Sequence, residues 1–299
     1  MSLFKQFAIL FLFISCSSSS IVDTANVAFF SNETVVYKKT SSDLNLTSLD
    51  IYTVQNSNTL KPVVVWIHGG GWAIGDKLNG MQAKVPFFND QGYIFVSLNY
   101  RLSPFPYELN NERRIKHPAH SIDVVDALQW IQNNVHKYGG DASKMVLIGH
   151  SAGAHLVALS GTNQQLLRDR NINLSSIKGV ISLDTQAYNV PYAIENLNEK
   201  DLYLNAFSND TANQKDASPF YQLDNYNSVI SNWMFASRGS LVRREILNDF
   251  TNKLISKGGN VDIVAMDGYS HADVNDLISD GSNSILSSRI EQFLATVFQ

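Results

Sequence analysis

The sequence predicts an α/β fold in which a mainly parallel sheet carries helices on both faces. Short, continuous apolar runs such as Val63–Ile67 and Met145–Ile148 are typical of strands that are covered on both faces. Segments with apolar residues at helical spacing alternate with these runs, which implies crossover connections between parallel strands. The 299 residues are enough for one large domain of this kind.

The predicted strands begin with two antiparallel edge strands. Glu33–Tyr37 and Leu44–Val54 alternate apolar and polar residues, as half-buried strands do. The buried strands follow at Val63–Ile67, Tyr93–Leu98, Met145–Ile148, Gly179–Leu183, Trp233–Ala236 and Val261–Met266. Functional residues are expected directly after these strands, because ligands bind beyond the carboxyl ends of such sheets.

Helices are predicted between the strands. They are expected at Asn79–Gln91, Pro118–Tyr138, Ala152 to about Gly161, Leu241–Lys257 and Ile285–Phe298. In the second of these, Ile122, Val125 and Leu128 recur at helical spacing. The stretch 188–227 has no clean period, and it is predicted to be a cap insertion over the strand ends, because such long surface segments are usually functional.

The composition excludes several classes of protein. The formal charge is −4 and no dense basic cluster appears, which argues against a nucleic-acid partner. The sequence has no phosphate-binding glycine loop and no Cys/His spacing typical of zinc, so neither a cofactor nor a metal is expected. With one cysteine, Cys16, an internal disulfide is impossible.

Residues 1–16 are predicted to be an export signal. Lys5 precedes the apolar run Phe7–Ile14, which is too short to span a bilayer but suits the core of a signal peptide. The segment Phe13–Cys16 resembles a bacterial lipobox, so Cys16 is expected to become a lipidated first residue. The alternative is a plain secretory signal with an incidental cysteine.

The rest of the chain is predicted to be a flexible tether at 17–25 and a single domain at 26–299. Both kinds of signal direct export, so the protein is expected in the cell envelope, in the periplasm or outside the cell. A lipid on Cys16 would tether it to a membrane.

The motif that organises the chain is Gly149–Gly153, which places Ser151 between an apolar strand and a helix. A turn this tight leaves no room for side chains beside the serine, which explains the two glycines. Ser151 is therefore predicted to stand exposed at the carboxyl end of its strand, above a helix N-terminus.

A serine nucleophile needs a base, and His271 is the predicted one. It follows the last strand on a loop, from which its imidazole can reach Ser151. The other histidines occupy turn, loop or helix positions and are predicted to be structural: His68, His117, His120, His136, His150 and His155.

The developing oxyanion needs hydrogen-bond donors, and backbone N–H groups serve well because they are preorganised. Ala152 offers one at the start of its helix. The run Gly69–Gly71 offers more, because glycines let the backbone approach a ligand closely.

Four motifs together carry a family resemblance: His68–Trp72, Asn99–Ser103, Tyr138–Asp141 and Gly149–Gly153. They resemble those of α/β-hydrolase carboxylesterases of the hormone-sensitive-lipase and feruloyl-esterase-like groups, and the resemblance extends over about residues 62–271. It implies an α/β-hydrolase fold with Ser151 as the nucleophile and His271 as the base. It also implies an oxyanion hole formed by Gly70, Gly71 and Ala152.

The triad acid departs from this pattern. Members of these groups usually carry it after the seventh strand, but here that loop, Ala236–Arg244, contains no acid. Asp184, at the end of the preceding strand, is the predicted acid because it keeps the superfamily's chain order. Lesser candidates are Glu245, Asp249 and Asp267. Alternatively the acid is weak or absent.

Three arginines lie near the acid-free loop: Arg238, Arg243 and Arg244. They could bind a carboxylate or phosphate of the substrate.

The sequence thus predicts a serine hydrolase that cleaves a carboxylic ester with a short acyl group, on a small-molecule or glycan substrate. Kynurenine formamidases share the motif pattern, so an arylformamidase-like amide hydrolase stays an alternative. A degraded hydrolase that only binds its ligand is another. The sequence does not indicate an oligomeric state.

Overall fold

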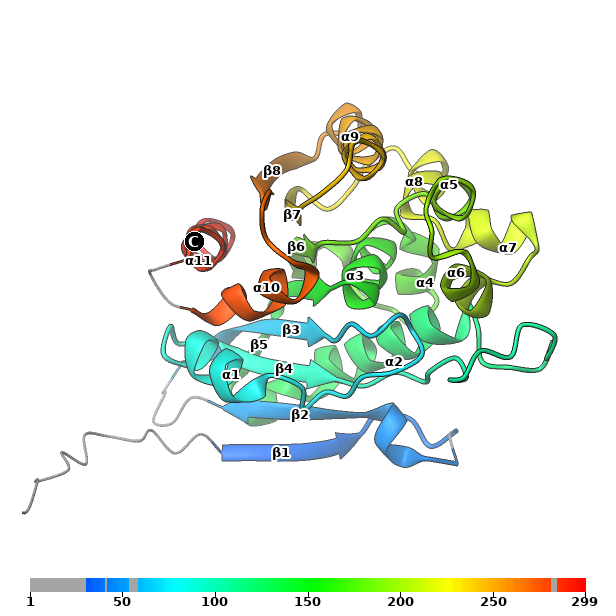
Figure 1. Cartoon of the computed structure of the whole chain (residues 1–299). Coiled ribbons are helices and arrows are strands. Elements are labelled where there is room, and N and C mark those ends of the chain that lie inside the picture. The colour runs from blue at the N-terminus through cyan, green and yellow to red at the C-terminus, as the bar shows by residue number, and fades with distance from the viewer. Residues whose placement is uncertain (1–30, 41, 54–58, 281–283) are drawn as a thin grey trace, which may run out of the picture.

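The computed structural model describes residues 31–40, 42–53, 59–280 and 284–299 (Figure 1). The predicted signal peptide, Cys16 and the tether lie outside these residues. Within the described ranges, no helix has the length and apolar character needed to cross a membrane.

A mixed sheet forms the centre of the described chain, which confirms the predicted α/β fold. Its strands are β1 (Ser31–Val36), β2 (Ser48–Thr53), β3 (Lys61–Ile67), β4 (Ile94–Leu98), β5 (Gly140–His150), β6 (Ile177–Leu183), β7 (Asn232–Ser237) and β8 (Asn260–Ala265). Their spatial order is β1-β2-β4-β3-β5-β6-β7-β8. The strands β1, β2 and β4 pair antiparallel, and all pairs from β4 to β8 are parallel.

Helices cover both faces of this sheet. The longer ones are α1 (Met81–Asn89), α2 (Ala119–Asn134), α3 (Ala152–Thr162), α9 (Leu241–Ser256) and α11 (Ile285–Val297). The short ones are α4 (Gln164–Arg168), α5 (Val190–Asn196), α6 (Lys200–Phe207), α7 (Thr211–Asp216), α8 (Pro219–Gln222) and α10 (His271–Asp276). Single 3-10 turns are η1 (Leu44–Thr47), η2 (Val135–Tyr138), η3 (Leu174–Ser176), η4 (Leu223–Asn225) and η5 (Leu277–Ser279).

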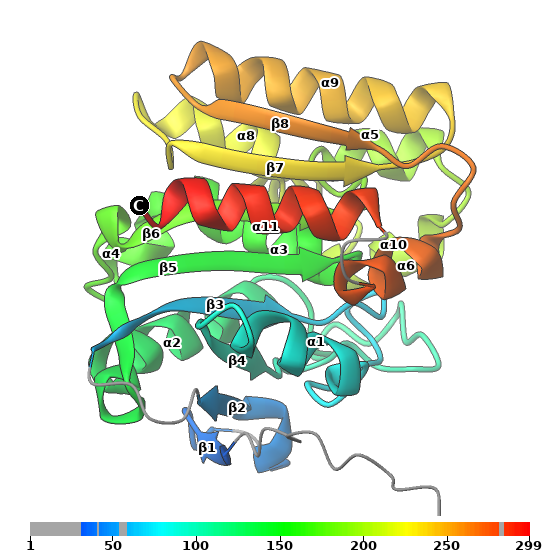
Figure 2. The ribbon, with the colours of Figure 1, turned by 90° about the vertical axis from the view of Figure 1, so that its left-hand side faces the viewer.

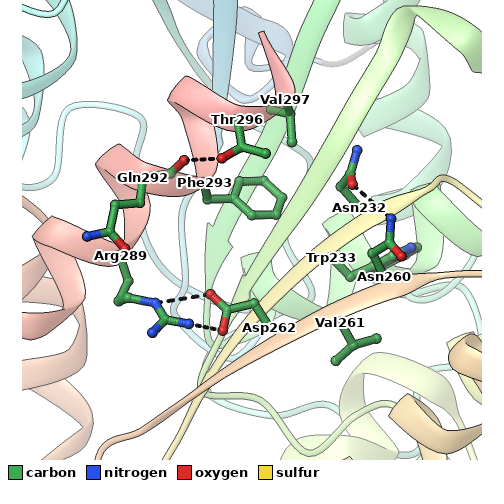
Figure 3. Close-up of a pocket in the computed structure, with 10 residues that line it drawn as sticks. All are labelled: Asn232, Trp233, Asn260, Val261, Asp262, Arg289, Gln292, Phe293, Thr296 and Val297. Atoms are coloured by element: carbon green, nitrogen blue, oxygen red, sulfur yellow. Dashed lines mark hydrogen bonds and ion pairs between the residues drawn. The ribbon is translucent and has the colours of Figure 1, made fainter. Parts of the chain in front are cut away.

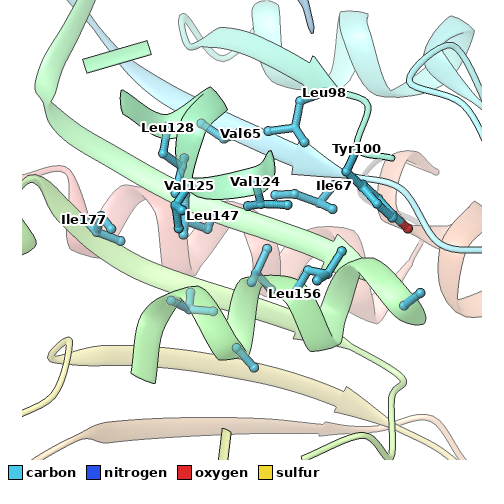
Figure 4. Close-up of a cluster of buried hydrophobic side chains, with 14 of the residues drawn as sticks. Val65, Ile67, Leu98, Tyr100, Val124, Val125, Leu128, Leu147, Leu156 and Ile177 are labelled. Carbon is cyan, nitrogen blue, oxygen red and sulfur yellow. The ribbon is translucent and has the colours of Figure 1, made fainter. Parts of the chain in front are cut away.

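The sheet divides the interior into two hydrophobic cores, because neighbouring side chains of a strand point to opposite faces. On β3, Val63 and Val65 belong to one core, which also contains residues of α2, α3 and α9. Figure 4 shows part of this core, with Val65 labelled. Val64 and Trp66 pack on the other face with α1 and α11. Figure 1 shows these two helix layers on either side of the strands. Burial on both faces explains why the central strands are continuous apolar runs.

Two segments differ from the predictions. The second edge strand begins at Ser48 rather than Leu44, because Leu44–Thr47 forms a 3-10 turn. The cap stretch, 188–227, carries four helices of four to eight residues, α5 to α8. Helices this short contain too few turns to show a period in the sequence.

The parallel strands all end at one edge of the sheet. Figure 2 shows α6 and α10 at this edge, beside the arrowheads of the strands. Gly69 follows β3, Ser151 follows β5, Asp184 follows β6 and Arg238 follows β7.

Candidate active site

Ser151 occupies the sharp turn between β5 and α3. Its backbone has φ 57° and ψ −119°, a conformation that L residues rarely adopt. Its N–H group donates to the carbonyl oxygen of Leu183 at 2.9 Å, which ties the turn to β6. A strained serine between a strand and a helix is the geometry of a nucleophile elbow.

The two glycines that flank this turn are fixed by close contacts rather than by their φ angles. A Cβ atom on Gly149 would lie 2.4 Å from the carbonyl carbon of Gly153. A Cβ atom on Gly153 would lie 2.0 Å from the carbonyl oxygen of Ile67. Any side chain at either position would therefore push α3 away from β3 and β5.

His271 and Asp184 form a direct pair. Nδ1 of His271 donates to Oδ2 of Asp184 at 2.5 Å. His271 is the first residue of α10 rather than part of a free loop, and Ser270 and Asp273 close a capping box around this helix start. With Nδ1 carrying the proton, Nε2 is left free to accept one.

Two arginines hold the other sides of the Asp184 carboxylate. Nε of Arg238 donates to Oδ2 at 2.6 Å, and Nη2 of Arg243 donates to Oδ1 at 2.5 Å. Nε of Arg243 also donates to the carbonyl oxygen of Arg238 at 3.0 Å. The loop that lacks an acid therefore supplies cations to an acid on the neighbouring strand.

These contacts keep the fully buried Asp184 side chain ionised. Burial by itself raises the pKa of this carboxyl group, but the hydrogen bond from His271 and the charges of Arg243 and Arg238 outweigh it. The net result lowers the pKa of Asp184 to about 2.

The lesser acid candidates have other contacts. Asp267 pairs with Arg244 at 2.7 Å, and both side chains are about half exposed. Glu245 accepts a hydrogen bond from the hydroxyl of Tyr192 at 3.0 Å, and Asp249 is exposed on α9. Among the described residues, Asp184 is thus the only one of the candidates in contact with His271.

His150 supports His271 from the opposite side, a role that the sequence did not indicate. Its Nε2 donates to the carbonyl oxygen of His271 at 3.0 Å, and the two ring centres are 4.4 Å apart. Burial, followed by the proximity of His271, lowers the pKa of His150 to about 3. The His150 ring therefore stays neutral near pH 7.

Ser151 and His271 lie together on the walls of two cavities. The apolar cavity, of about 320 Å³, is also lined by Gly70, Gly71, Ala73, Ile74, Phe105, Tyr107, His150 and Leu202. The polar cavity, of about 210 Å³, is also lined by Gly71, Trp72, Ala152, Asp184, Thr185, Gln186, Glu199, Leu202, Tyr203, Arg238 and Arg243. Among the described residues, no hydrogen bond joins Ser151 to His271. Catalytic hydrogen bonds often tighten only when substrate binds.

The predicted oxyanion-hole residues border these cavities. Gly70 and Gly71 have φ angles of 105° and 60°, in the region that favours glycine. The carbonyl oxygen of Gly70 accepts from the N–H groups of Ala73 at 3.1 Å and Ile74 at 3.0 Å, which closes the turn. Gly71 and Ala152 both border the polar cavity beside Ser151.

Trp72 anchors this glycine turn in the protein interior. Its Nε1 donates to Nδ1 of His155 at 3.2 Å, and Nε2 of His155 donates to the carbonyl oxygen of Ala217 at 2.7 Å. The Trp72 carbonyl oxygen accepts from the N–H of Ser103 at 2.8 Å. His155 is thus a buried connection between the turn and the cap, as its predicted structural role requires.

His150, Asp184 and His271 are close enough to be considered as metal ligands, because their ligand atoms lie within 4.8 Å of one another. The Asp184 oxygens, however, already accept from His271 and two guanidinium groups. A cation there would meet two positive charges, so the arrangement suits proton transfer better than metal binding.

A third cavity, of about 380 Å³, lies between β7, β8 and α11 (Figure 3). Asn232 and Asn260, at the starts of β7 and β8, line it, and Arg289 pairs with Asp262 beside it. It holds none of the predicted site residues and is at the opposite end of these strands.

The comparisons with known proteins agree with this architecture. The BD-FAE family matches residues 49–227, more than half of the chain. Juvenile hormone esterase of Heliothis virescens is 36% identical over 121 residues, which are 38% of this chain and 21% of that protein. The probable isoprenylcysteine alpha-carbonyl methylesterase ICMEL2 of Arabidopsis thaliana is 26% identical over 240 residues, 76% of this chain and 54% of that protein. The chain thus matches between a fifth and about half of the length of these two relatives.

Solved structures share the fold. An inhibited esterase B from Lactobacillus rhamnosis superposes with a TM-score of 0.70 at 18% identity, covering 90% of this chain and 87% of that one. A truncated carbohydrate esterase from gut microbiota gives 0.68 at 16% identity, covering 90% of this chain and 97% of that one.

Proposed function

The chain belongs to the BD-FAE family, and from this premise we propose that it is a serine carboxylesterase. The observation that carries the proposal is the arrangement at the end of β6. Asp184 is buried and ionised, it orients His271 through Nδ1, and His271 shares two cavity walls with the strained Ser151. This is the constellation that activates a serine for attack on an acyl carbon.

In the proposed reaction, Ser151 Oγ attacks the ester carbonyl while His271 Nε2 accepts its proton. Gly70, Gly71 and Ala152 present backbone N–H groups to the developing oxyanion. His271 then protonates the leaving alcohol. Water activated by His271 attacks the acyl-enzyme, releases the acid and restores Ser151.

The size of the cavities supports small substrate groups. Volumes of about 320 and 210 Å³ lie at or below the lower end of the range for small-molecule pockets. We therefore propose a short acyl group, on either a small molecule or a glycan.

Hydrolysis of p-nitrophenyl acetate, butyrate and octanoate by the purified chain tests this proposal, with Ser151→Ala as the control. Release of p-nitrophenol that disappears in Ser151→Ala is expected, with the octanoate the slowest of the three. A fluorophosphonate probe is expected to label the wild-type chain and not the variant. Labelling without ester hydrolysis would favour an amide substrate instead, and no labelling would favour a protein that only binds its ligand.

We also propose that the chain is exported and lipidated at Cys16. Lys5, the apolar run Phe7–Ile14 and the position of Cys16 support this. Expression of the full chain in a bacterium and mass spectrometry of its first residue test it. A lipidated cysteine at the new N-terminus is expected, and Cys16→Ser should abolish membrane recovery. An unmodified Cys16 in a processed, released chain would contradict lipidation.

A further inference from the structure

The polar cavity beside Ser151 contains hydrogen-bond donors that the protein leaves unused. Of the Arg238 guanidinium, only Nε has an acceptor among the described residues. Gln186 is 8% exposed, and its buried Nε2 has no hydrogen-bond partner. The Gln186 amide is a buried donor without an acceptor, which is destabilising, and the Arg238 side chain is 25% exposed with free donors. Both lie on the cavity wall, so the cavity suits a ligand with acceptor oxygens.

The charge of the cavity interior favours an anion. Arg238 and Arg243 contribute two positive charges, and Asp184 contributes one negative charge. Both carboxylate oxygens of Asp184 already accept hydrogen bonds. Glu199 also lines the cavity, but it is exposed at the start of α6, and no ion pair within 4 Å joins it to either arginine among the described residues. Apart from the exposed Glu199, the two arginines and Asp184 therefore leave one positive charge in excess.

We propose that the polar cavity binds a carboxylate group of the ester substrate, with Arg238 and Gln186 as its donors. The inference rests on the proposed esterase function and adds a substrate class to it: esters that carry a carboxylate on a short chain. A planar guanidinium suits a carboxylate because it can donate two parallel hydrogen bonds. The volume of about 210 Å³ admits such a chain and excludes a large one.

The competing explanation is that Arg238 only positions Asp184. Both explanations predict a lower turnover when Arg238 is replaced, because Asp184 orients His271. They differ in the ratio of kcat/KM for an anionic ester to kcat/KM for a neutral ester of the same shape. Loss of positioning lowers both values equally, whereas loss of a carboxylate-binding donor lowers the ratio.

Two pairs of substrates measure this ratio, one for each half of the ester. Monoethyl succinate and ethyl 4-methylpentanoate differ by a carboxylate in place of an isopropyl group on the acid side. The anion 3-acetoxypropanoate and 3-methylbutyl acetate differ in the same way on the alcohol side. Wild-type protein is expected to prefer the anionic member of at least one pair, and that pair identifies which half of the ester enters the polar cavity.

Variants then assign the preference to residues. Arg238→Gln is expected to lower the ratio about tenfold, and the similarly shaped Gln186→Leu about threefold. Glu199→Gln removes a repelling charge at the rim and should raise the ratio about twofold. Arg244→Gln is the matched control, because Arg244 pairs with Asp267 outside the cavity, and it should leave the ratio unchanged.

Failure of this inference differs from failure of the proposed function. If the wild-type protein hydrolyses the neutral esters but prefers neither anion, the carboxylate site is wrong and the esterase is retained. An unchanged ratio in both Arg238→Gln and Gln186→Leu would also overturn it. If no ester of either pair is hydrolysed and Ser151 is not labelled by the fluorophosphonate probe, the esterase function is wrong, and the inference with it.

Discussion

Asp184 and His271 are joined by a 2.5 Å hydrogen bond although they are 87 positions apart in the chain. The bond links the end of β6 to the start of α10, and it is supported on one side by two arginines and on the other by His150. Asp184, directly after β6, thus contacts His271, whereas the loop after β7 offers it no acid.

Asp184→Asn is expected to lower kcat by about 10⁴-fold, because an amide does not stabilise the imidazolium of His271. The same change leaves Arg238 and Arg243 without an anion, so the free energy of unfolding should fall by about 3 kcal/mol. Ester turnover and urea unfolding measure the two effects. Asp267→Asn, which breaks an exposed ion pair, is the control and should change neither appreciably. Near wild-type turnover by folded Asp184→Asn would show that another group orients His271.

Gly153→Ala is expected to lower the free energy of unfolding by about 3 kcal/mol, because its Cβ would lie 2.0 Å from the Ile67 carbonyl oxygen. Gly139→Ala is the comparison. Gly139 has φ 80° with no neighbouring atom within 4 Å, so only backbone strain of about 1 kcal/mol is expected. Chemical denaturation of both variants checks the difference. Equal losses would mean that the contact between α3 and β3 is looser than the structure shows.

His155 should make the fold sensitive to acid. Burial lowers the pKa of His155 from 6.5 to about 3. Protonation of Nδ1 would also remove the acceptor for Trp72 Nε1. The unfolded chain then binds a proton below pH 6.5 that the folded chain does not bind, so stability falls as the pH falls. The expected slope from this residue is about 1.4 kcal/mol per pH unit between roughly pH 6 and pH 4.

Urea unfolding of the wild type and of His155→Gln across this range measures that slope. The variant is expected to be less stable at pH 7 and to lose less stability on acidification. Parallel pH profiles for the two proteins would contradict the expectation.

Lys84→Met is expected to stabilise the protein at pH 7. Lys84 is 2% exposed, and its ammonium group lies 4.8 Å from the centre of the Trp66 ring, with no ion pair or hydrogen bond to another described residue. Burial lowers the pKa of Lys84 to about 8, although Asp276 partly opposes this. Stability therefore falls as the pH falls from 10.5 to 8, where only the unfolded chain takes up this proton.

Methionine has a similar length and no charge, so the gain should be about 2 kcal/mol at pH 7 and should shrink above pH 10. Thermal unfolding at both pH values checks this. A destabilised variant would mean that the contact with Trp66 outweighs the desolvation of the ammonium group.

The sequence predicted the strands and their ends well because burial on both faces leaves an apolar run. Each predicted catalytic residue, Ser151, Asp184 or His271, comes a few positions at most after such a run. Their meeting at one edge of the sheet could therefore be inferred. The helical start at His271 was missed, although Ser270 and Asp273 have the spacing of a capping box.

The partners of Asp184 could not be predicted in the same way. Arg238 and Arg243 are 54 and 59 positions from Asp184, and a surface arginine on a helix face has the same local pattern. The sequence offered these arginines as ligands for a substrate anion. The structure pairs both with Asp184, a contact that the sequence did not indicate, and anion binding by Arg238 stays a prediction. The support that His150 gives to His271 depends likewise on ring positions that no spacing reveals.

The site is assembled from segments that follow five neighbouring parallel strands, from Gly70 after β3 to His271 after β8. Parallel pairing of distant segments is slow, because each contact closes a long loop of chain. During refolding, β8 and α10 must dock before His271 can meet Asp184, even if the strands β3 to β6 have already formed. Recovery of esterase activity would then follow the last docking step, while circular dichroism follows the earlier growth of the sheet.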